Sequence, residues 1–249
     1  MSDFGQALRD WRGRRRMSQM ALALEADVSP RHVSFLESGR SRPSRAMVSR
    51  LCAALDVPPA ARNRLFLDAG LAPQHSEELP EGPEREAVER AVGWMLARHD
   101  PYPAIVIDRH WRLVQANRTA TALLAPLGVE IGGSLVDALD TTARSGILVN
   151  AAEVAHHTRT RLAHESAHFG GDAVLDAAVR RIDRLFPRGE AAEEMPPFLT
   201  VRYRLGETDL ALFSVLSQFA SAYDVGLSEM RVELMFPADG ATEAFLKTI

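Results

Sequence analysis

The sequence has only one cysteine, Cys52, among its 249 residues. A lone cysteine can build neither an internal disulfide nor a thiolate cluster for zinc, so both frameworks are excluded and a cytoplasmic location is expected. No segment approaches the roughly 18 consecutive apolar residues of a membrane-spanning helix, and residues 1–16 carry charge with no apolar block behind them. We therefore expect no membrane association and no secretory signal.

Several catalytic signatures are missing as well. The sequence contains no G-x-G-x-x-G fingerprint, no Walker-type phosphate loop and no G-x-S-x-G nucleophile elbow. We therefore expect no cofactor. Cys52 lies at helical spacing from Val48 and Leu55, which predicts a core position rather than a nucleophile.

Lysine is nearly absent, and arginine supplies positive charge unevenly along the chain. Residues 1–70 hold 12 Arg against 7 acidic residues, a net charge of +5, whereas residues 71–249 hold 17 basic and 26 acidic residues, a net charge of −9. A basic module joined to an acidic one indicates a polyanionic partner for the first module. The chain as a whole, with 46% hydrophobic and 25% charged residues, has the composition of a globular protein.

Two domains with a linker between them are expected. Residues 1–70 contain five short stretches of helical periodicity separated by turn residues, which predicts an all-α domain of five helices. Residues 71–83 are rich in Pro, Glu and Gly and have no period, which indicates a linker. Residues 84–249 form the second domain.

The second domain has the pattern of an α+β fold with an antiparallel sheet and helices on one face. Asn117 is placed to cap a helix that follows the first pair of strands. The expected elements are a helix over 84–99, strands at 104–108 and 113–116, helices across 134–186, and three antiparallel strands at 198–205, 210–216 and 228–236.

The first domain contains a candidate DNA-reading helix. A helix opening at Ser29 and Pro30, a short turn after a helix over 19–26, predicts a helix-turn-helix that binds double-stranded operator DNA. Arg31 and His32 in its first turn can donate to guanine acceptors, and Phe35 can meet a thymine methyl. The residues expected at phosphate groups are Gln19, Ser29, Arg40 and Arg42.

This region resembles the XRE (Cro/repressor-like) helix-turn-helix family across nearly all of residues 1–70. Ser18-Gln19, Val28-Ser29, Glu37-Ser38-Gly39-Arg40 and Arg42-Pro43-Ser44 fall at the spacing of that family. The resemblance implies an ion pair between Arg12 and Glu37 beneath the recognition helix. Asp27 stands where the family often has glycine, and Asp tolerates the left-handed conformation that the turn requires. Because one small module offers few base contacts, we expect a homodimer on two half-sites.

The second domain carries its own resemblance. PYPAIVIDRHWRLVQANRTATALL, residues 101–124, is similar to the opening of a PAS-type sensor fold, and LSEMRVELMFPADGAT, residues 227–242, resembles the closing strands of the MmyB-like transcription-regulator ligand-binding domain. Together these resemblances imply a one-component bacterial regulator. They also imply an apolar pocket for a small-molecule effector of fatty-acyl type.

Alternation along the strands identifies the face expected to contact the ligand. A filled core would use the same residues, so the alternation leaves open whether this face lines a cavity. The strand at 210–216 is apolar on both sides, which predicts cover on both faces. The expected ligand contacts are Ile105, Ile107, Leu113, Val201, Tyr203, Val232 and Leu234.

Two alternatives remain beside a ligand-sensing regulator. His164, Glu165 and His168 fit the H-E-x-x-H pattern of zinc hydrolases, in which Glu is the general base, but the extended pattern fails at Val174. Helical phase puts both histidines, together with His157, opposite the apolar stripe and in contact with water. We therefore expect no enzyme. The second alternative is a DNA-binding scaffold or antitoxin whose second domain binds protein.

Overall fold

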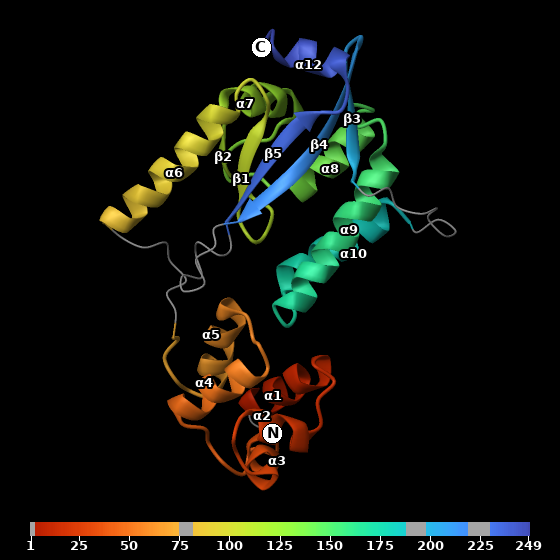
Figure 1. Ribbon diagram of the computed structural model, residues 1–249. Coiled ribbons are helices and arrows are strands. Elements are labelled where there is room, and N and C mark those ends of the chain that lie inside the picture. Colours follow the sequence, from red (N-terminus) through yellow and green to blue (C-terminus); the bar gives the residue numbers. More distant parts are fainter. Residues whose placement is uncertain (1–2, 75–81, 188–197, 219–229) are drawn as a thin grey trace. The chain divides into compact units, whose positions relative to one another are not determined.

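The computed structural model describes residues 3–74, 82–187, 198–218 and 230–249, which form two compact units (Figure 1). One unit holds five helices, and the other holds an antiparallel sheet with helices, as the sequence predicted. Among the described residues, no helix combines the length and apolar character needed to cross a membrane.

Three of the five helices of the first unit begin at a serine that caps them. The hydroxyl groups of Ser18, Ser29 and Ser44 each accept a hydrogen bond from the backbone N–H three residues later, which satisfies a donor that the first turn leaves open. The helices are α1 (Asp3–Arg14), α2 (Gln19–Glu25), α3 (Pro30–Glu37), α4 (Arg45–Ala54) and α5 (Pro59–Asp68).

The turn between α2 and α3 depends on a residue that accepts positive φ. Asp27 has φ of 50°, as expected for an Asp in place of glycine, and Val28 N donates to the carbonyl of Ala23 over 2.9 Å. Gly5 on α1 lies against the end of α3, where a Cβ atom would be 2.7 Å from the carbonyl oxygen of Glu37. The close approach of α1 to α3 therefore requires glycine at this position.

One buried apolar cluster holds the first unit together. Cys52 belongs to it, and burial raises the pKa of its thiol to about 12, so this cysteine is a core residue, as predicted. The largest fully buried side chains of the cluster are Leu8, Leu22, Leu36, Leu51, Leu55 and Phe66.

The second unit contains a five-stranded antiparallel sheet in the order β2-β1-β5-β4-β3. The strand latest in the sequence, β5, therefore lies in the middle of the sheet. The strands are β1 (Ala104–Ile107), β2 (Leu113–Ala116), β3 (Thr200–Leu205), β4 (Thr208–Gln218) and β5 (Arg231–Pro237).

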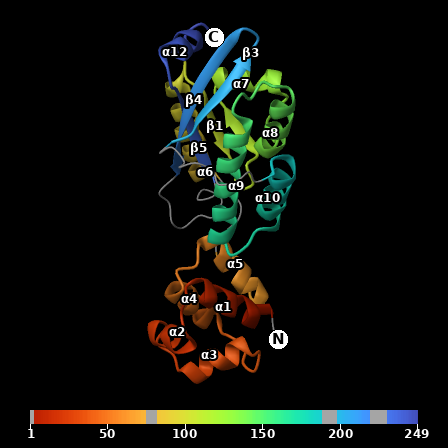
Figure 2. The same ribbon diagram turned by 90° about the vertical axis from the view of Figure 1, so that its right-hand side faces the viewer.

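Helices cover both faces of this sheet, whereas the order of elements in the sequence suggested helices on one face only. Ile105 and Ile107 of β1 pack with residues of the helices that follow β2, whereas Ala104 and Val106 are buried on the other face, where α6 packs against β1. Figures 1 and 2 show α6 on the opposite side of the sheet from α8, α9 and α10. The helices are α6 (Pro83–His99), α7 (Arg118–Leu124), η1 (Ala125–Leu127), α8 (Leu135–Arg144), α9 (Ala151–His168), α10 (Ala173–Leu185) and α12 (Gly240–Leu246).

Asn117 joins three of these elements. Its side-chain oxygen caps α7 by accepting from Ala120 N over 2.9 Å, and it also accepts from Ala104 N at the start of β1 over 3.1 Å. Its amide donates to the carbonyls of Tyr102 and Leu96, which ties α6 to the sheet. The predicted cap is therefore also a buried link between α6, β1 and α7.

The strand predicted to be covered on both faces, 210–216, is covered for only part of its length. Leu210 and Leu212 of β4 are buried, but Val215 and Leu216 are 49% and 39% exposed. The expectation was wrong for this end of β4. An apolar side chain can remain exposed at the protein surface, so its presence on a strand does not show that another element covers it.

Candidate functional site

The N-terminal end of α3 is open to solvent, as a DNA-reading helix requires. Ser29, Pro30 and Arg31 are exposed, and His32 is half-buried. The Ser29 hydroxyl accepts a hydrogen bond from His32 N over 3.2 Å, so this side chain serves as the cap while it remains at the surface. Val33 and Leu36 on the other face of α3 are fully buried, which fixes the helix to the unit.

The Phe35 ring contacts two of the arginines that are expected to bind DNA. The guanidinium carbon of Arg31 lies 5.2 Å from the centroid of the Phe35 ring, and that of Arg40 lies 5.9 Å from it. Both distances are within the range of cation–π attraction. The ring therefore holds a base-reading candidate and a phosphate-binding candidate side by side, whereas Arg42 is exposed further along the chain.

Gln19 has a different position from the one that the sequence suggested. Its side-chain amide donates to Glu37 Oε2 over 2.8 Å and is half-buried, so the side chain is used inside the unit rather than held out for a phosphate. The structure therefore gives the Gln19 side chain a role inside the unit, and its contact with a phosphate stays a prediction. Its backbone N–H remains at the first residue of α2.

Arg12 and Glu37 form the ion pair implied by the family resemblance. Arg12 Nε and Nη2 donate to the two carboxylate oxygens of Glu37 over 2.6 and 3.1 Å, and Arg9 Nε lies 3.5 Å from the same carboxylate. Burial by itself would raise the pKa of Glu37. The hydrogen bonds from Arg12 and Gln19 outweigh that effect and hold the pKa below its ordinary value.

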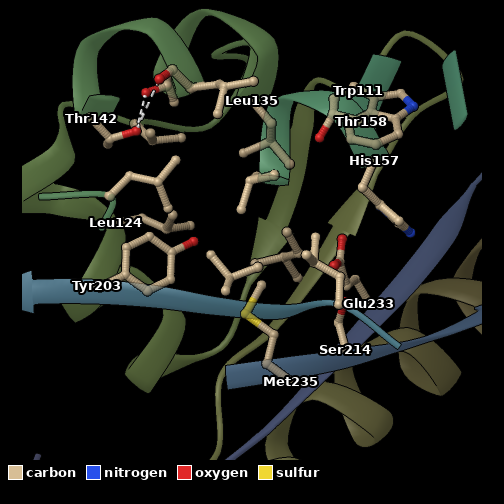
Figure 3. Close-up of a pocket in the computed structure, with 18 of the residues that line it drawn as sticks. Trp111, Leu124, Leu135, Thr142, His157, Thr158, Tyr203, Ser214, Glu233 and Met235 are labelled. Carbon is tan, nitrogen blue, oxygen red and sulfur yellow. Dashed lines mark hydrogen bonds between the residues drawn. The ribbon is translucent and has the colours of Figure 1, made fainter. Parts of the chain in front are cut away.

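The second unit contains a cavity of about 440 Å³ between the sheet and the helices α7, α8 and α9 (Figure 3). Its wall is mostly apolar, and burial raises the pKa of Tyr203 to about 12, which keeps that hydroxyl neutral. The apolar lining residues are Ile105, Trp111, Leu124, Leu127, Val129, Leu135, Ala138, Leu139, Leu148, Val154, Phe198, Leu199, Val201, Leu216 and Met235.

Three of the seven residues expected at a ligand line this cavity: Ile105, Val201 and Tyr203. Ile107 and Leu113 point to the same side of the sheet but are buried in the adjoining apolar cluster and do not line the cavity. Their expected ligand contact is therefore wrong, because they fill the core beside it.

The expectation for Val232 and Leu234 was wrong in another way, because the opposite face of β5 meets the cavity. Antiparallel pairing places Val232 beside Val106 and Leu234 beside Ala104, on the side of the sheet that α6 covers. Glu233 and Met235 are the β5 residues that line the cavity.

A buried polar network closes one end of the cavity. The carboxylate of Glu165 accepts from Trp111 Nε1 over 2.9 Å and from Arg161 Nε over 3.0 Å, and Arg231 Nη1 lies 2.5 Å from it. Burial would raise the pKa of Glu165, but the hydrogen bonds from Arg231 and Trp111 lower it below the ordinary value. The network joins α9, β5 and the turn between β1 and β2.

This network gives the H-E-x-x-H segment a structural role. His164 and His168 are exposed, as predicted, but Glu165 is tied by three donors and is not placed to act as a general base. His157 does not face water as predicted; it is half-buried and lines the cavity. Burial and the charge of Arg161 lower its pKa. Within the described ranges, no three His, Cys, Asp or Glu residues are grouped to hold a metal.

Comparisons with known proteins find two family matches in separate parts of the chain. Residues 3–65 match the family described as helix-turn-helix domain. The PAS domain from Bordetella pertussis BvgS is similar over 64% of this chain and 94% of that chain, with 17% sequence identity and a TM-score of 0.29, and no curated protein matches. Residues 88–249, more than half of the chain, match the MmyB-like transcription regulator ligand binding domain, so the chain belongs to the helix-turn-helix transcription regulators that carry this domain.

Proposed function

We propose that this chain is a one-component bacterial regulator that binds operator DNA through α3 and senses an apolar small molecule in the second unit. The observation that carries the proposal is the presence, in one chain, of an exposed arginine-bearing α3 and a largely apolar cavity of about 440 Å³. Cavities of a few hundred Å³ with apolar walls and few polar groups are typical of small-molecule sites.

In this proposal the start of α3 enters the major groove of the operator. Arg31 reads a guanine through its O6 and N7 atoms, and His32 contacts a neighbouring base edge. Ser29 and the first backbone N–H groups of α3 approach a phosphate, and Arg40 and Arg42 bind phosphates in a sequence-independent manner. A homodimer would place two such helices on two half-sites.

The effector in this proposal is an apolar molecule of fatty-acyl type that binds in the cavity. The regulator itself is proposed to be cytoplasmic. Side chains of the sheet and of three helices surround the cavity, so a ligand there contacts both layers of the second unit. A ligand changes operator affinity only if it binds the DNA-competent and incompetent arrangements unequally, and such coupling typically amounts to about 5- to 150-fold.

The DNA half of the proposal is tested with an operator selected from random duplexes. Arg31→Ala should relax the base preference and weaken binding by about 1–3 kcal/mol, because it removes a base contact. Arg42→Ala is the matched control and should weaken all sequences by a similar factor. An Arg31→Ala protein with the parent's preferred sequence and affinity would show that α3 does not read DNA in this register.

The sensing half is tested by operator affinity with and without a saturating apolar ligand. Val201→Asp places a carboxylate in the cavity wall and should abolish the response, because burial of an unpaired charge is unfavourable. Thr200→Asp, one residue away on β3 and outside the lining, is the control. Equal operator affinity with and without the ligand refutes sensing. A protein partner bound at a fixed stoichiometry to the second unit would instead support a scaffold.

A further inference from the structure

One side of α6 is apolar and is left open by the part of the second unit that the structure describes. Trp94 is 62% exposed, and Ala87 and Ala91 on the same side of the helix are exposed as well. Val92 and Leu96 lie on a different side of α6, where they are buried and fix the helix to the sheet. Figure 1 shows α6 along one border of the second unit, so this open side is available to another chain.

The residues of this open side have the spacing of a helix-pairing surface. All of them are exposed, and they are separated alternately by three and four positions, the repeat with which one helix packs lengthwise against another. We call them the α6 seam: Glu84, Ala87, Ala91, Trp94 and Arg98. The Trp94 ring is held by the Arg98 guanidinium, whose carbon lies 5.4 Å from the ring centroid. Tryptophan and arginine are enriched where proteins contact one another.

Ion pairing within α6 leaves one residue of each sign over, at the two ends of the seam. The other glutamates and arginines of the helix form two pairs between residues four positions apart. These pairs are Arg85 with Glu89 and Arg90 with Glu86. Among the described residues, neither Glu84 nor Arg98 has an ion-pair partner. The seam therefore ends in a free carboxylate on one side and a free guanidinium on the other, which is the charge pattern of a self-complementary surface.

We infer that α6 joins two copies of this chain, in antiparallel orientation about a two-fold axis at Ala91. Glu84 and Arg98 each lie seven residues from Ala91, so this pairing brings Glu84 of each copy beside Arg98 of the other. Trp94 of one copy packs against the small side chain of Ala87 in the other. Parallel pairing would instead bring like charges together and align the two helix dipoles. The inference rests on the proposed function in one respect, since it names the surface that joins the two copies required by two half-sites.

A pair of α6 helices alone forms a weak dimer. The helix has 17 residues and is about 25 Å long, so the paired surface is smaller than the roughly 1,600 Å² of a standard interface. We expect the free protein to dissociate in the micromolar range. Two half-sites on one duplex hold both copies close together and should reinforce the pairing.

The inference is tested by sedimentation equilibrium of the full chain across the micromolar range. Glu84→Arg and Arg98→Glu each place like charges together twice in the two-fold dimer, and each should weaken dimerisation by about 10-fold. The double variant Glu84→Arg/Arg98→Glu restores opposite charges at both ends of the seam. It should dimerise as tightly as the parent protein, which a mere loss of folding in the single variants would not allow.

Two further variants test the apolar part of the seam and the helix outside it. Trp94→Ala removes the largest side chain of the seam and should weaken dimerisation by about 10-fold. Because this side chain is mostly exposed in the single chain, the variant should keep the circular dichroism of the parent protein. Glu89→Arg is the matched control, since it reverses a charge on another side of α6 and should leave dimerisation unchanged.

The outcomes separate the inference from the proposed function. A parent protein that stays monomeric, both free and on the selected operator, overturns the α6 interface and leaves DNA binding standing. A dimer that withstands Trp94→Ala and the single charge reversals also overturns it, because the copies then meet elsewhere. A double variant that is folded but does not regain dimerisation refutes the antiparallel register. If the parent protein dimerises through α6 but binds no duplex, the proposed function fails and the interface stands.

Discussion

Replacing Glu37 with glutamine removes the charge of a buried carboxylate while it preserves the shape of the side chain. Glu37 is 0% exposed, and it is contacted by Arg12, Arg9 and Gln19. Glutamine would present an amide to groups that are all donors at this position. The variant therefore leaves the Arg12 guanidinium without its counter-charge.

The magnitude follows from how deeply the pair is buried. Removal of one partner of a buried ion pair typically destabilises a protein by about 3–5 kcal/mol. The Arg12 side chain is 17% exposed and keeps its hydrogen bond to the carbonyl of Met17 over 2.8 Å, so water and backbone offset part of the loss. We expect the lower end, about 3 kcal/mol, which is a large fraction of the roughly 5–15 kcal/mol that stabilises a domain.

The matched control is Asp56→Asn, which makes the same carboxylate-to-amide change at the surface of the same unit. The Asp56 side chain is 93% exposed and 3.4 Å from Arg15, and Asn accepts its φ of 45°. We expect a loss below about 1 kcal/mol. Hydrogen exchange of amides in α1–α5 of the full chain, measured in increasing urea, gives the free energy of unfolding of this unit separately from the other.

Acid provides an independent check on the same carboxylate. The folded-state pKa of Glu37 is lowered from its ordinary value of 4.5, so its stabilisation is complete above that pH and is lost as the pH falls toward the lowered value. The difference between the parent protein and Glu37→Gln should therefore shrink below about pH 4.5. If Glu37→Gln unfolds with the same free energy as Asp56→Asn at neutral pH, the pair does not stabilise the unit and this reasoning is wrong.

Four further predictions concern other sites. Gly5→Ala should destabilise the first unit by about 1–3 kcal/mol in thermal unfolding, because its Cβ would meet a carbonyl of α3, whereas Gly13→Ala meets nothing within 4 Å and should not. The thiol of Cys52, with its pKa raised to about 12, should react with a disulfide reagent only after unfolding; rapid labelling of the native protein would contradict this. The lowered pKa of His157 means that the unfolded chain binds a proton more readily, so stability should fall below about pH 6.5 and His157→Gln should reduce that fall in urea titrations. Phe35→Leu should weaken operator binding by about 1 kcal/mol with an unchanged salt dependence, since both arginines remain; an unchanged affinity would show that the ring does not position them.

Elements that depend on local chemistry were predictable from the sequence. Ser18, Ser29, Ser44 and Asn117 each cap the helix that follows them, and Asp27 takes positive φ in the turn that precedes α3. A cap needs only a short side chain and a backbone N–H two or three residues later, so the sequence alone contains the information. Asp239 at the start of α12 is a signal of the same kind, and the sequence analysis missed it.

Features that depend on a distant partner were not predictable in this way. The alternation of apolar and polar residues shows that β5 has two different faces but not which face lines the cavity. In the structure α6 covers the more apolar face, which carries Val232 and Leu234. His157 was assigned by the helix surface that it occupies and Gln19 by its place at the start of a helix, whereas their environments depend on β5 and on α3. The helix-turn-helix was therefore easier to predict than the cavity, whose wall combines residues of eight separate elements.

The position of β5 in the middle of the sheet has a consequence for synthesis of the chain. A ribosome releases the five local helices of the first unit long before β5 emerges, so that unit can fold while the sheet is still incomplete. Until β5 inserts, β1 and β4 each present an unpaired edge, and such edges promote association between nascent chains. Truncation before residue 231 should therefore yield a folded DNA-binding unit attached to an aggregation-prone partial sheet.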